Sequence, residues 1–347
     1  MTKKLFALAL ISAASAASAQ TSLNLYGLVD ASVESVRAGS TNLTRVSSSN
    51  LASSRFGLKG VEDLGGGLSA KFVLESAVTV DTGANGGGST RFFDRAAWVG
   101  LSGGFGELRL GRQDSSIGLL AGNSSILGAQ AYDDFKIAKT VAGDKYRRID
   151  NAITYVLPTL VAGFSAQVQY SPQAGTSDVV GTEAANNRTG RTYGLNVQYT
   201  AGAFGAGLGY LVADANNIGP KDKAALAYVS YDFTDAKLTG YYNRSAGHLG
   251  LAGARYLYGM RLDVPMGDAF TLQTSVSRAS EWQYVRDNAD ATIVSLKGVY
   301  SLSKRTSIYA LATTVSNDDN SAIAVGGLTG VAGERSSGLA VGVSHKF

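Results

Sequence analysis

The chain has 347 residues, of which 17% are charged and 45% hydrophobic, and its formal net charge is +4. That charge is small and no basic run is clustered, so nucleic acid is excluded as an expected partner. The absence of cysteine excludes a disulfide scaffold, thiolate metal sites and a cysteine nucleophile. The 43 glycines against four prolines favour many tight turns between strands with uninterrupted hydrogen-bond ladders.

The N-terminus predicts a secretory signal peptide over residues 1–19. Lys3 and Lys4 form a positive region, a mostly apolar run follows from Leu5 to Ala16, and Ala17-Ser18-Ala19 is a small-residue cleavage site. A membrane anchor is the less favoured alternative, because the apolar run is too short to span comfortably. No later apolar stretch is long enough for a transmembrane helix, so the exported chain is secreted, periplasmic or a membrane barrel.

From Leu23 onward the sequence predicts strands from end to end. In the first strand, alternate residues from Leu23 to Val33 are apolar or small, and those between them, from Asn24 to Glu34, are mostly polar. A period of two indicates a strand with one dry and one wet face. The pattern recurs over Leu68–Val80, Ala225–Phe233 and Leu339–Phe347, and no helical period is recognisable after residue 20.

The connections between these strands alternate in length. The short turns are Glu62–Gly67, Ser102–Gly106, Thr200–Ala203, Phe233–Ala236, Pro265–Asp268 and Ser301–Lys304. The long polar links are Arg37–Asn50, Asp81–Thr90, Asp114–Tyr146, Gln173–Gly190 and Ser316–Glu334. This sorting predicts an all-β fold over residues 20–347, a transmembrane antiparallel β-barrel of about 16 strands with short periplasmic turns and long extracellular loops.

The longest link, Asp114 to Tyr146, is predicted to fold into the barrel. A link of this length without secondary structure is normally functional or disordered. About sixteen strands leave an aqueous lumen that side chains alone cannot fill. An inward-folded loop over residues 114–146 would therefore narrow the channel.

Several segments resemble the general porins of β-proteobacteria. The similarity runs from about Leu23 to Tyr170 and returns at the C-terminus, whereas residues 173–335 match mainly in pattern. The segments that carry it are Leu23–Asp30, Ser54–Gly65, Phe93–Leu101, Leu110–Gln113, Asn151–Tyr155, Gly163-Phe164 and the terminal Ser344-His345-Lys346-Phe347. They occur in the family's order and at family-like spacing.

The resemblance implies an outer-membrane porin, a water-filled channel for passive diffusion of small hydrophilic solutes and ions, without cofactor, metal or catalytic residues. It implies a homotrimer with three separate pores, surrounded by outer-membrane lipid and lipopolysaccharide. It further implies that the terminal Phe347 is the assembly signal read by the barrel-assembly machinery.

The resemblance also implies a cluster of wall arginines in each pore, here Arg55, Arg95 and Arg148, facing acidic groups on the inward loop. Rings of arginine bias a pore toward anions, so a mild anion preference is expected. Asp133 and Asp134 are the candidate acidic partners. The loop sequence around them departs from the Pro-Glu-Phe-Gly type of segment expected in the family, which leaves the exact partner open.

Alternation along the strands supports two of these arginines. Arg55 has the opposite parity to Phe56, and Arg148 has the opposite parity to Ile149 and Ile153. Arg95 shares the parity of apolar neighbours on its strand, so its assignment depends on the resemblance. The alternative for each arginine is a solvated lumen charge without a selective role.

Two other function classes compete with a channel. An outer-membrane adhesin or structural barrel would act through its long loops with a plugged lumen, but no plug domain is visible. A hydrolase needs a histidine held near a serine and a carboxylate. His248 lies in a glycine-rich loop and His345 in the terminal strand, so neither suits that role. The run Asn317–Asn320 is interpreted as a solvated loop, because the spacing of a calcium-binding loop is missing.

We expect cleavage after Ala19, because the small-residue site directly follows the apolar run. Mass spectrometry of the protein purified from outer membranes should give a mature chain that begins at Gln20. A retained Met1 would contradict the predicted export signal.

Overall fold

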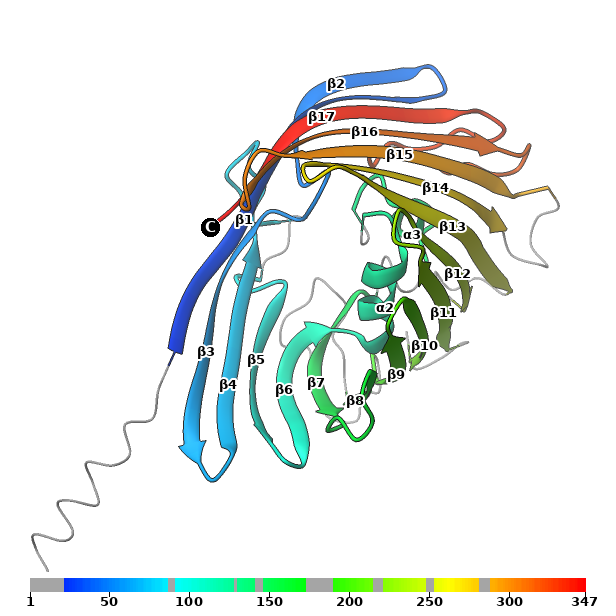
Figure 1. Ribbon diagram of the computed structural model, residues 1–347. Coiled ribbons are helices and arrows are strands. Elements are labelled where there is room, and N and C mark those ends of the chain that lie inside the picture. The colour runs from blue at the N-terminus through cyan, green and yellow to red at the C-terminus, as the bar shows by residue number, and fades with distance from the viewer. Residues whose placement is uncertain are drawn as a thin grey trace, which may run out of the picture.

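The computed structural model describes residues 22–86, 91–127, 130–140, 146–172, 190–214, 221–247, 253–280 and 288–347. The predicted signal peptide and His248 lie outside these residues. Seventeen labelled strands form one antiparallel sheet that curls into a barrel (Figure 1). Their bounds are β1 (Ser22–Ala38), β2 (Thr41–Ser48), β3 (Arg55–Gly65), β4 (Leu68–Ala77), β5 (Ala96–Gly103), β6 (Gly106–Asp114), β7 (Arg148–Val156), β8 (Phe164–Ser171), β9 (Thr192–Ala201), β10 (Phe204–Ala213), β11 (Asp222–Asp232), β12 (Lys237–Ala246), β13 (Ala254–Met266), β14 (Phe270–Ser280), β15 (Ala291–Ser301), β16 (Thr306–Asn317) and β17 (Ser336–Lys346).

The sheet closes through β1, which is long enough to pair with three other strands. Along one edge it pairs with β17 from Leu28 to Ala38. Along the other edge its Ala31–Ala38 half pairs with β2 and its Ser22–Leu28 part pairs with β3. Strands β2 and β3 therefore follow one another in a single position of the barrel, and the closed structure has sixteen strands. This confirms the predicted strand number and the antiparallel order.

The apolar face that the alternation predicted for the strands forms the outer surface of the barrel. On β1, Leu23, Leu25 and Val33 are 59–65% exposed in the isolated chain, whereas Asp30 and Glu34 on the other face are buried. An apolar exterior and a polar interior suit a barrel surrounded by lipid. Exposed aromatic side chains flank this band on the outside. They include Tyr199, Phe204, Tyr231 and Phe233 at the short-turn end and Tyr193, Tyr210, Tyr242 and Tyr258 toward the long-loop end.

The alternation used to place Arg148 is interrupted within β7. Asn151 has a positive φ of 52°, and the pairing of β6 with β7 shifts by one residue between Gly111 and Gln113. Ile153 is exposed on the outside, but Ile149 is buried in the interior core, so the two do not share a face as the parity argument assumed. A bulge inserts one extra residue, and this reverses the inside-outside order of the residues beyond it.

In the described residues of the link between β6 and β7 lie two short helices, α2 (Ser116–Ser124) and α3 (Asp134–Ile137), although no helical period was recognisable in the sequence after residue 20. Ser115 caps α2 by accepting a hydrogen bond from the amide of Gly118 at 2.9 Å. The helix has only nine residues and includes two glycines, so it leaves little periodic signal in the sequence. Neither α2 nor any other helix in the described part of the chain has the length and apolar character of a membrane span.

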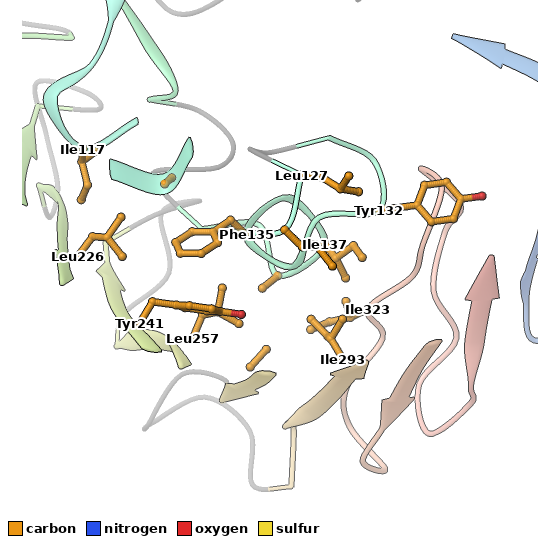
Figure 2. Packing of buried hydrophobic residues seen from close by; sticks show 14 of the residues in the cluster. Ile117, Leu127, Tyr132, Phe135, Ile137, Leu226, Tyr241, Leu257, Ile293 and Ile323 are labelled. Atoms are coloured by element: carbon orange, nitrogen blue, oxygen red, sulfur yellow. The ribbon is translucent and has the colours of Figure 1, made fainter. Parts of the chain in front are cut away.

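Both helices lie inside the barrel and pack on its inner wall. Ile117 and Leu120 of α2 are buried together with Leu211 and Leu226 of β10 and β11. Figure 2 shows Phe135 of α3 directed toward Tyr241 on β12, and the two ring centroids are 5.4 Å apart. The same core continues to Ile293 on β15 and Ile323 in the last long loop. Apolar side chains of the loop and of the inner wall from β10 to β16 therefore pack into one core inside the barrel.

At the seam where the two ends of the chain pair, we expect folding of the barrel to be sensitive to substitution of Gly27. Its amide and carbonyl exchange two hydrogen bonds with Phe347, at 3.2 and 3.1 Å. A Cβ at residue 27 would lie 2.3 Å from the Phe347 ring. We expect Gly27→Val to displace this ring at a cost of about 1–3 kcal/mol, typical of overpacking. Less folded, heat-modifiable barrel should then appear in electrophoresis of outer membranes. Gly104→Val, in an open turn with nothing within 4 Å, is the matched control. Equal amounts of folded barrel for both variants would contradict this role of the seam.

Candidate functional site

Two of the predicted arginines meet at one carboxylate on the inner wall. Glu75 on β4 forms ion pairs with Arg55 on β3, at 3.5 Å, and with Arg95 just before β5, at 2.6 Å. Tyr26 on β1 donates its hydroxyl hydrogen bond to the same carboxylate at 2.9 Å. Arg95 also donates its backbone amide to the carbonyl of Glu75, which fixes it beside the strand. Arg95 precedes the first residue of β5, so the alternation along that strand does not indicate which way its side chain points.

The third predicted arginine joins a neighbouring group around Asp114, the last residue of β6. Its carboxylate lies 3.1 Å from Nε of Arg148 and 3.8 Å from Nη2 of Arg147. Arg95 and Arg112 are also among the charges that act most strongly on it. The sites at Glu75 and Asp114 are therefore parts of one cluster, which includes Arg55, Arg95 and Arg148 together.

Asp150 on β7 extends this cluster with two further arginines. Arg91 lies 2.5 Å from its carboxylate, and Arg112 contacts the other carboxylate oxygen. Arg112 also donates to the carbonyl of Asp94, whose own carboxylate accepts the amide of Ala77 at 2.7 Å. In the described part of the chain, six arginines and four carboxylates form this arginine cluster, so positive charge exceeds negative charge by two.

Basic side chains continue along the same wall toward the short turns. Lys59 follows Arg55 by four residues on β3, about 13 Å along a strand at the usual rise, and stacks over the ring of Tyr26 at 5.1 Å. Lys71 on β4 lies 2.9 Å from Glu107 on β6, and Arg109 contacts the same carboxylate. Among these described side chains, three cations accompany one carboxylate, so this part of the wall is also positive.

Asp133 and Asp134 occupy a different place from the one predicted for them. Both are fully buried, whereas the ion pairs of Arg55, Arg95 and Arg148 are formed with Glu75 and Asp114. Asp133 caps α3 and accepts the amides of Phe135 and Leu127, each at 3.0 Å. Asp134 accepts a hydrogen bond from the hydroxyl of Tyr241 on β12. Asp133 fixes the backbone of the loop itself, because short acidic side chains satisfy free amides at helix starts, and Asp134 attaches the loop to the wall.

The tip of the loop is attached to β1. Tyr132 donates its hydroxyl to Glu34 at 2.8 Å, and the same carboxylate accepts Asn50 at 3.0 Å and Arg45 at 2.5 Å. Burial and the Glu34 carboxylate raise the pKa of Tyr132, so its hydroxyl stays protonated and remains a donor. Arg45 also donates to the carbonyl of Gly326 at 2.8 Å. These contacts join the loop, the upper part of β1 and the last long loop.

The sequence alone did not single out Arg91, Arg112 and Arg147, nor the carboxylates that accompany them. Arg112 and Asp114 lie in or beside a segment that resembles the family, but the resemblance implied only Arg55, Arg95 and Arg148 as arginines of the pore wall. Arg147 and Arg148 are adjacent, and a regular strand would place them on opposite faces. The bulge at Asn151 makes simple parity unreliable there, and the ion pairs join strands that are distant in the sequence.

The sixteen-stranded barrel, its apolar exterior and the charged wall inside it define an outer-membrane diffusion channel. Residues 6–320 match the family model described as Gram-negative porin, and the chain belongs to this family. The outer membrane of a Gram-negative cell is therefore its location, and the adhesin alternative is not favoured.

Similar proteins support the more specific resemblance to porins of β-proteobacteria. Outer membrane porin protein 32 of Delftia acidovorans is 31% identical over 371 aligned residues, with both chains covered completely. An outer membrane porin protein of Bordetella pertussis is 30% identical, again over the full length of both. A solved anion-selective porin from Comamonas acidovorans has 27% identity and a TM-score of 0.79, and the match covers 94% of this chain and all of that one.

The burial of Asp134 predicts a pH dependence of the loop. Burial, and secondly the neighbouring Asp133 carboxylate, raise the pKa of Asp134 from 3.8 to about 7. The folded loop then binds this proton more tightly than the released loop does. Its contribution to stability is fully present below pH 3.8 and is lost as the pH rises through about 7. Single-channel recordings should show more open-channel current noise at pH 8 than at pH 5.

Asp134→Asn supplies a neutral side chain of the same shape, so its noise should stay low at both pH values. Asp268→Asn, at an exposed turn, should retain the pH dependence of the unchanged protein. A noise level that does not differ between pH 5 and pH 8 in the unchanged protein would contradict the prediction.

Proposed function

We propose that this porin conducts small hydrophilic solutes and ions passively, catalyses no reaction, and prefers anions mildly. The observation that supports this best is the uneven distribution of charge inside the barrel. The wall built from β3 to β7 carries the arginine cluster with its excess of two positive charges. On the opposite side of the interior, α2 and α3 pack against the wall around an apolar core.

The loop over residues 114–146 would narrow the lumen by occupying that opposite side. Solutes would then pass between the loop and the arginine cluster. Guanidinium groups stay charged at neutral pH, and surroundings of low dielectric constant strengthen their field. Anions would be drawn to this wall, while Glu75, Asp94, Asp114 and Asp150 offset part of the positive potential. A partly neutralised cluster of this kind suits a mild preference rather than strict exclusion of cations.

In this proposal Arg55, Arg95 and Arg148 form the constriction together with Arg91, Arg112 and Arg147. Asp133 and Asp134 act from the loop side as fixing groups and contribute little to the field in the passage, since both are fully buried. The solved relative from Comamonas acidovorans is described as anion-selective, which agrees with this arrangement.

We also propose that the channel assembles as a homotrimer, contacts lipopolysaccharide in the outer leaflet, and is inserted by the barrel-assembly machinery through Phe347. This is supported by the paired hydrogen bonds between Phe347 and Gly27, which lie at the end of the seam between β1 and β17. A barrel must leave no open strand edge in lipid, so a terminal residue that completes the seam is a suitable assembly signal.

The selectivity proposal predicts the effect of replacing Arg55, Arg95 and Arg148 with serine. Removal of three positive, bulky side chains should raise the single-channel conductance and move the zero-current potential toward cations in a potassium chloride gradient. The shift should shrink at high salt, because the Debye length falls from about 8 Å at physiological ionic strength to about 3 Å at 1 M.

The matched control removes three positive charges from exposed positions, through Lys304→Ser, Arg305→Ser and Arg335→Ser. This control should keep the original conductance and zero-current potential. If the arginine variant behaved like the control, the three arginines would not form the constriction.

A further inference from the structure

The C-terminal end of α2 lacks cations of its own. A helix end leaves carbonyl groups without intrahelical partners, and cations near it are favourable because of the helix dipole. The last turn of α2 contains no basic residue. The end of this helix lies inside the barrel, where Ser124 and Ser125 are buried. Ser124 and Ser125 satisfy the carbonyls of Leu120 and Ala121 from within the loop, and the carbonyls that follow are bound by donors from the wall.

Two cations of the barrel wall supply these donors. Arg261 on β13 donates from Nη1 to the carbonyl of Ser124 at 3.3 Å and also to that of Ser125. Lys297 on β15 donates from Nζ to the carbonyl of Ile126 at 2.6 Å and is only 7% exposed. Hydrogen bonds from charged donors are about twice as strong as those between neutral groups. Three successive carbonyl groups at the end of α2 are thus bound by two strands of the wall.

Neighbouring side chains orient the two cations. Asp263 on β13 pairs with Arg261, with its Oδ2 atom 3.0 Å from Nη2 and 3.1 Å from Nε. Gln273 on β14 donates to the other oxygen of Asp263 at 2.5 Å. Asp263, Gln273 and Lys297 lie directly opposite one another across three adjacent strands. The contacts with Asp263 therefore orient the guanidinium group of Arg261 toward the carbonyls of the loop.

The N-terminal end of α2 is held by amide side chains from β8 and β9. Gln169 accepts the backbone amide of Ser116 at 3.0 Å, and Asn196 donates to the carbonyl of Ser116 at 2.7 Å. Gln167 donates to the hydroxyl of Ser116 at 3.1 Å. The nine residues of α2 extend about 14 Å at the usual helical rise. The helix is thus fixed at both ends, to β8 and β9 at its start and to β13 and β15 at its end.

We propose that Arg261 and Lys297 are positioning residues that lock the pore loop against the wall, and that they do not set ion preference. Their charged groups contact backbone carbonyls of the loop, and the guanidinium group of Arg261 also contacts Asp263. The proposal rests on the proposed function only in that the loop narrows the lumen. It gives Arg261 and Lys297 a role different from that of the arginine cluster: they keep the passage at constant width and do not act on passing anions.

The test is a double variant, Arg261→Gln with Lys297→Gln, recorded as single channels in planar lipid bilayers at one fixed pH. Loss of both charged donors should free the end of α2. Open-channel current noise should rise several-fold and closure should occur at lower voltage, whereas the zero-current potential in a potassium chloride gradient should not move. The exchange of the two cations, Arg261→Lys with Lys297→Arg, should restore most of the quiet current. The control Lys304→Gln with Arg305→Gln removes the same charge from an exposed turn and should alter neither quantity.

An unchanged noise level in the double variant, or a zero-current potential that moves toward cations, would overturn the proposal. Should the double variant fail to give heat-modifiable barrel, Asp263→Asn provides the second test. It keeps both cations but removes the carboxylate that orients Arg261, so noise should rise to an intermediate level, and an unchanged level would count against the lock. Failure of the selectivity proposal would appear separately, as an unchanged zero-current potential in the arginine-to-serine variant.

Discussion

Every feature of this channel depends on one constraint, the need to pair all backbone amides and carbonyls of a chain that crosses lipid. A β-sheet meets it only by closing on itself, since any open edge would expose unpaired groups. Closure here requires β1 to pair with β17 along one edge and with β2 and β3 along the other. It also brings the C-terminal carbonyl and amide of Phe347 onto Gly27, where only a glycine leaves room for the aromatic ring.

Closure with sixteen strands creates a second requirement, because the resulting interior is too wide for wall side chains to fill. The chain meets this requirement asymmetrically. Leucine and isoleucine side chains on β10 to β16 point inward and form a dry core with α2, α3 and the last long loop. Charged side chains on β3 to β7 face the remaining space. The interior is therefore polar on both sides, but on β10 to β16 the polar side chains are interspersed with apolar ones that pack against the loop.

The parts of this structure that follow a local period were predictable, and those that depend on contacts between distant strands were not. Alternation and the sorting of turns and loops predicted the closed barrel and the inner face of β1. The same rule misassigned Ile149, because a positive φ at Asn151 inserts a bulge that no pattern signals. Asp133 and Asp134 could be placed on the loop but not oriented, since their partners are an adjacent helix start and Tyr241, more than a hundred residues away.

The distribution of cations shows why charge counts alone cannot predict the behaviour of a pore. Arg148 and Arg261 both lie on the inner wall and both pair with a carboxylate, at 3.1 and 3.0 Å. They differ in what lies beyond that carboxylate. Arg148 belongs to a cluster whose positive charge exceeds its negative charge. Arg261 also donates to the carbonyls of Ser124 and Ser125 at the end of α2, where the helix carries partial negative charge. We therefore propose that a cation beside backbone carbonyls serves to position the loop, and that only an excess of cations facing the passage sets the choice of ions.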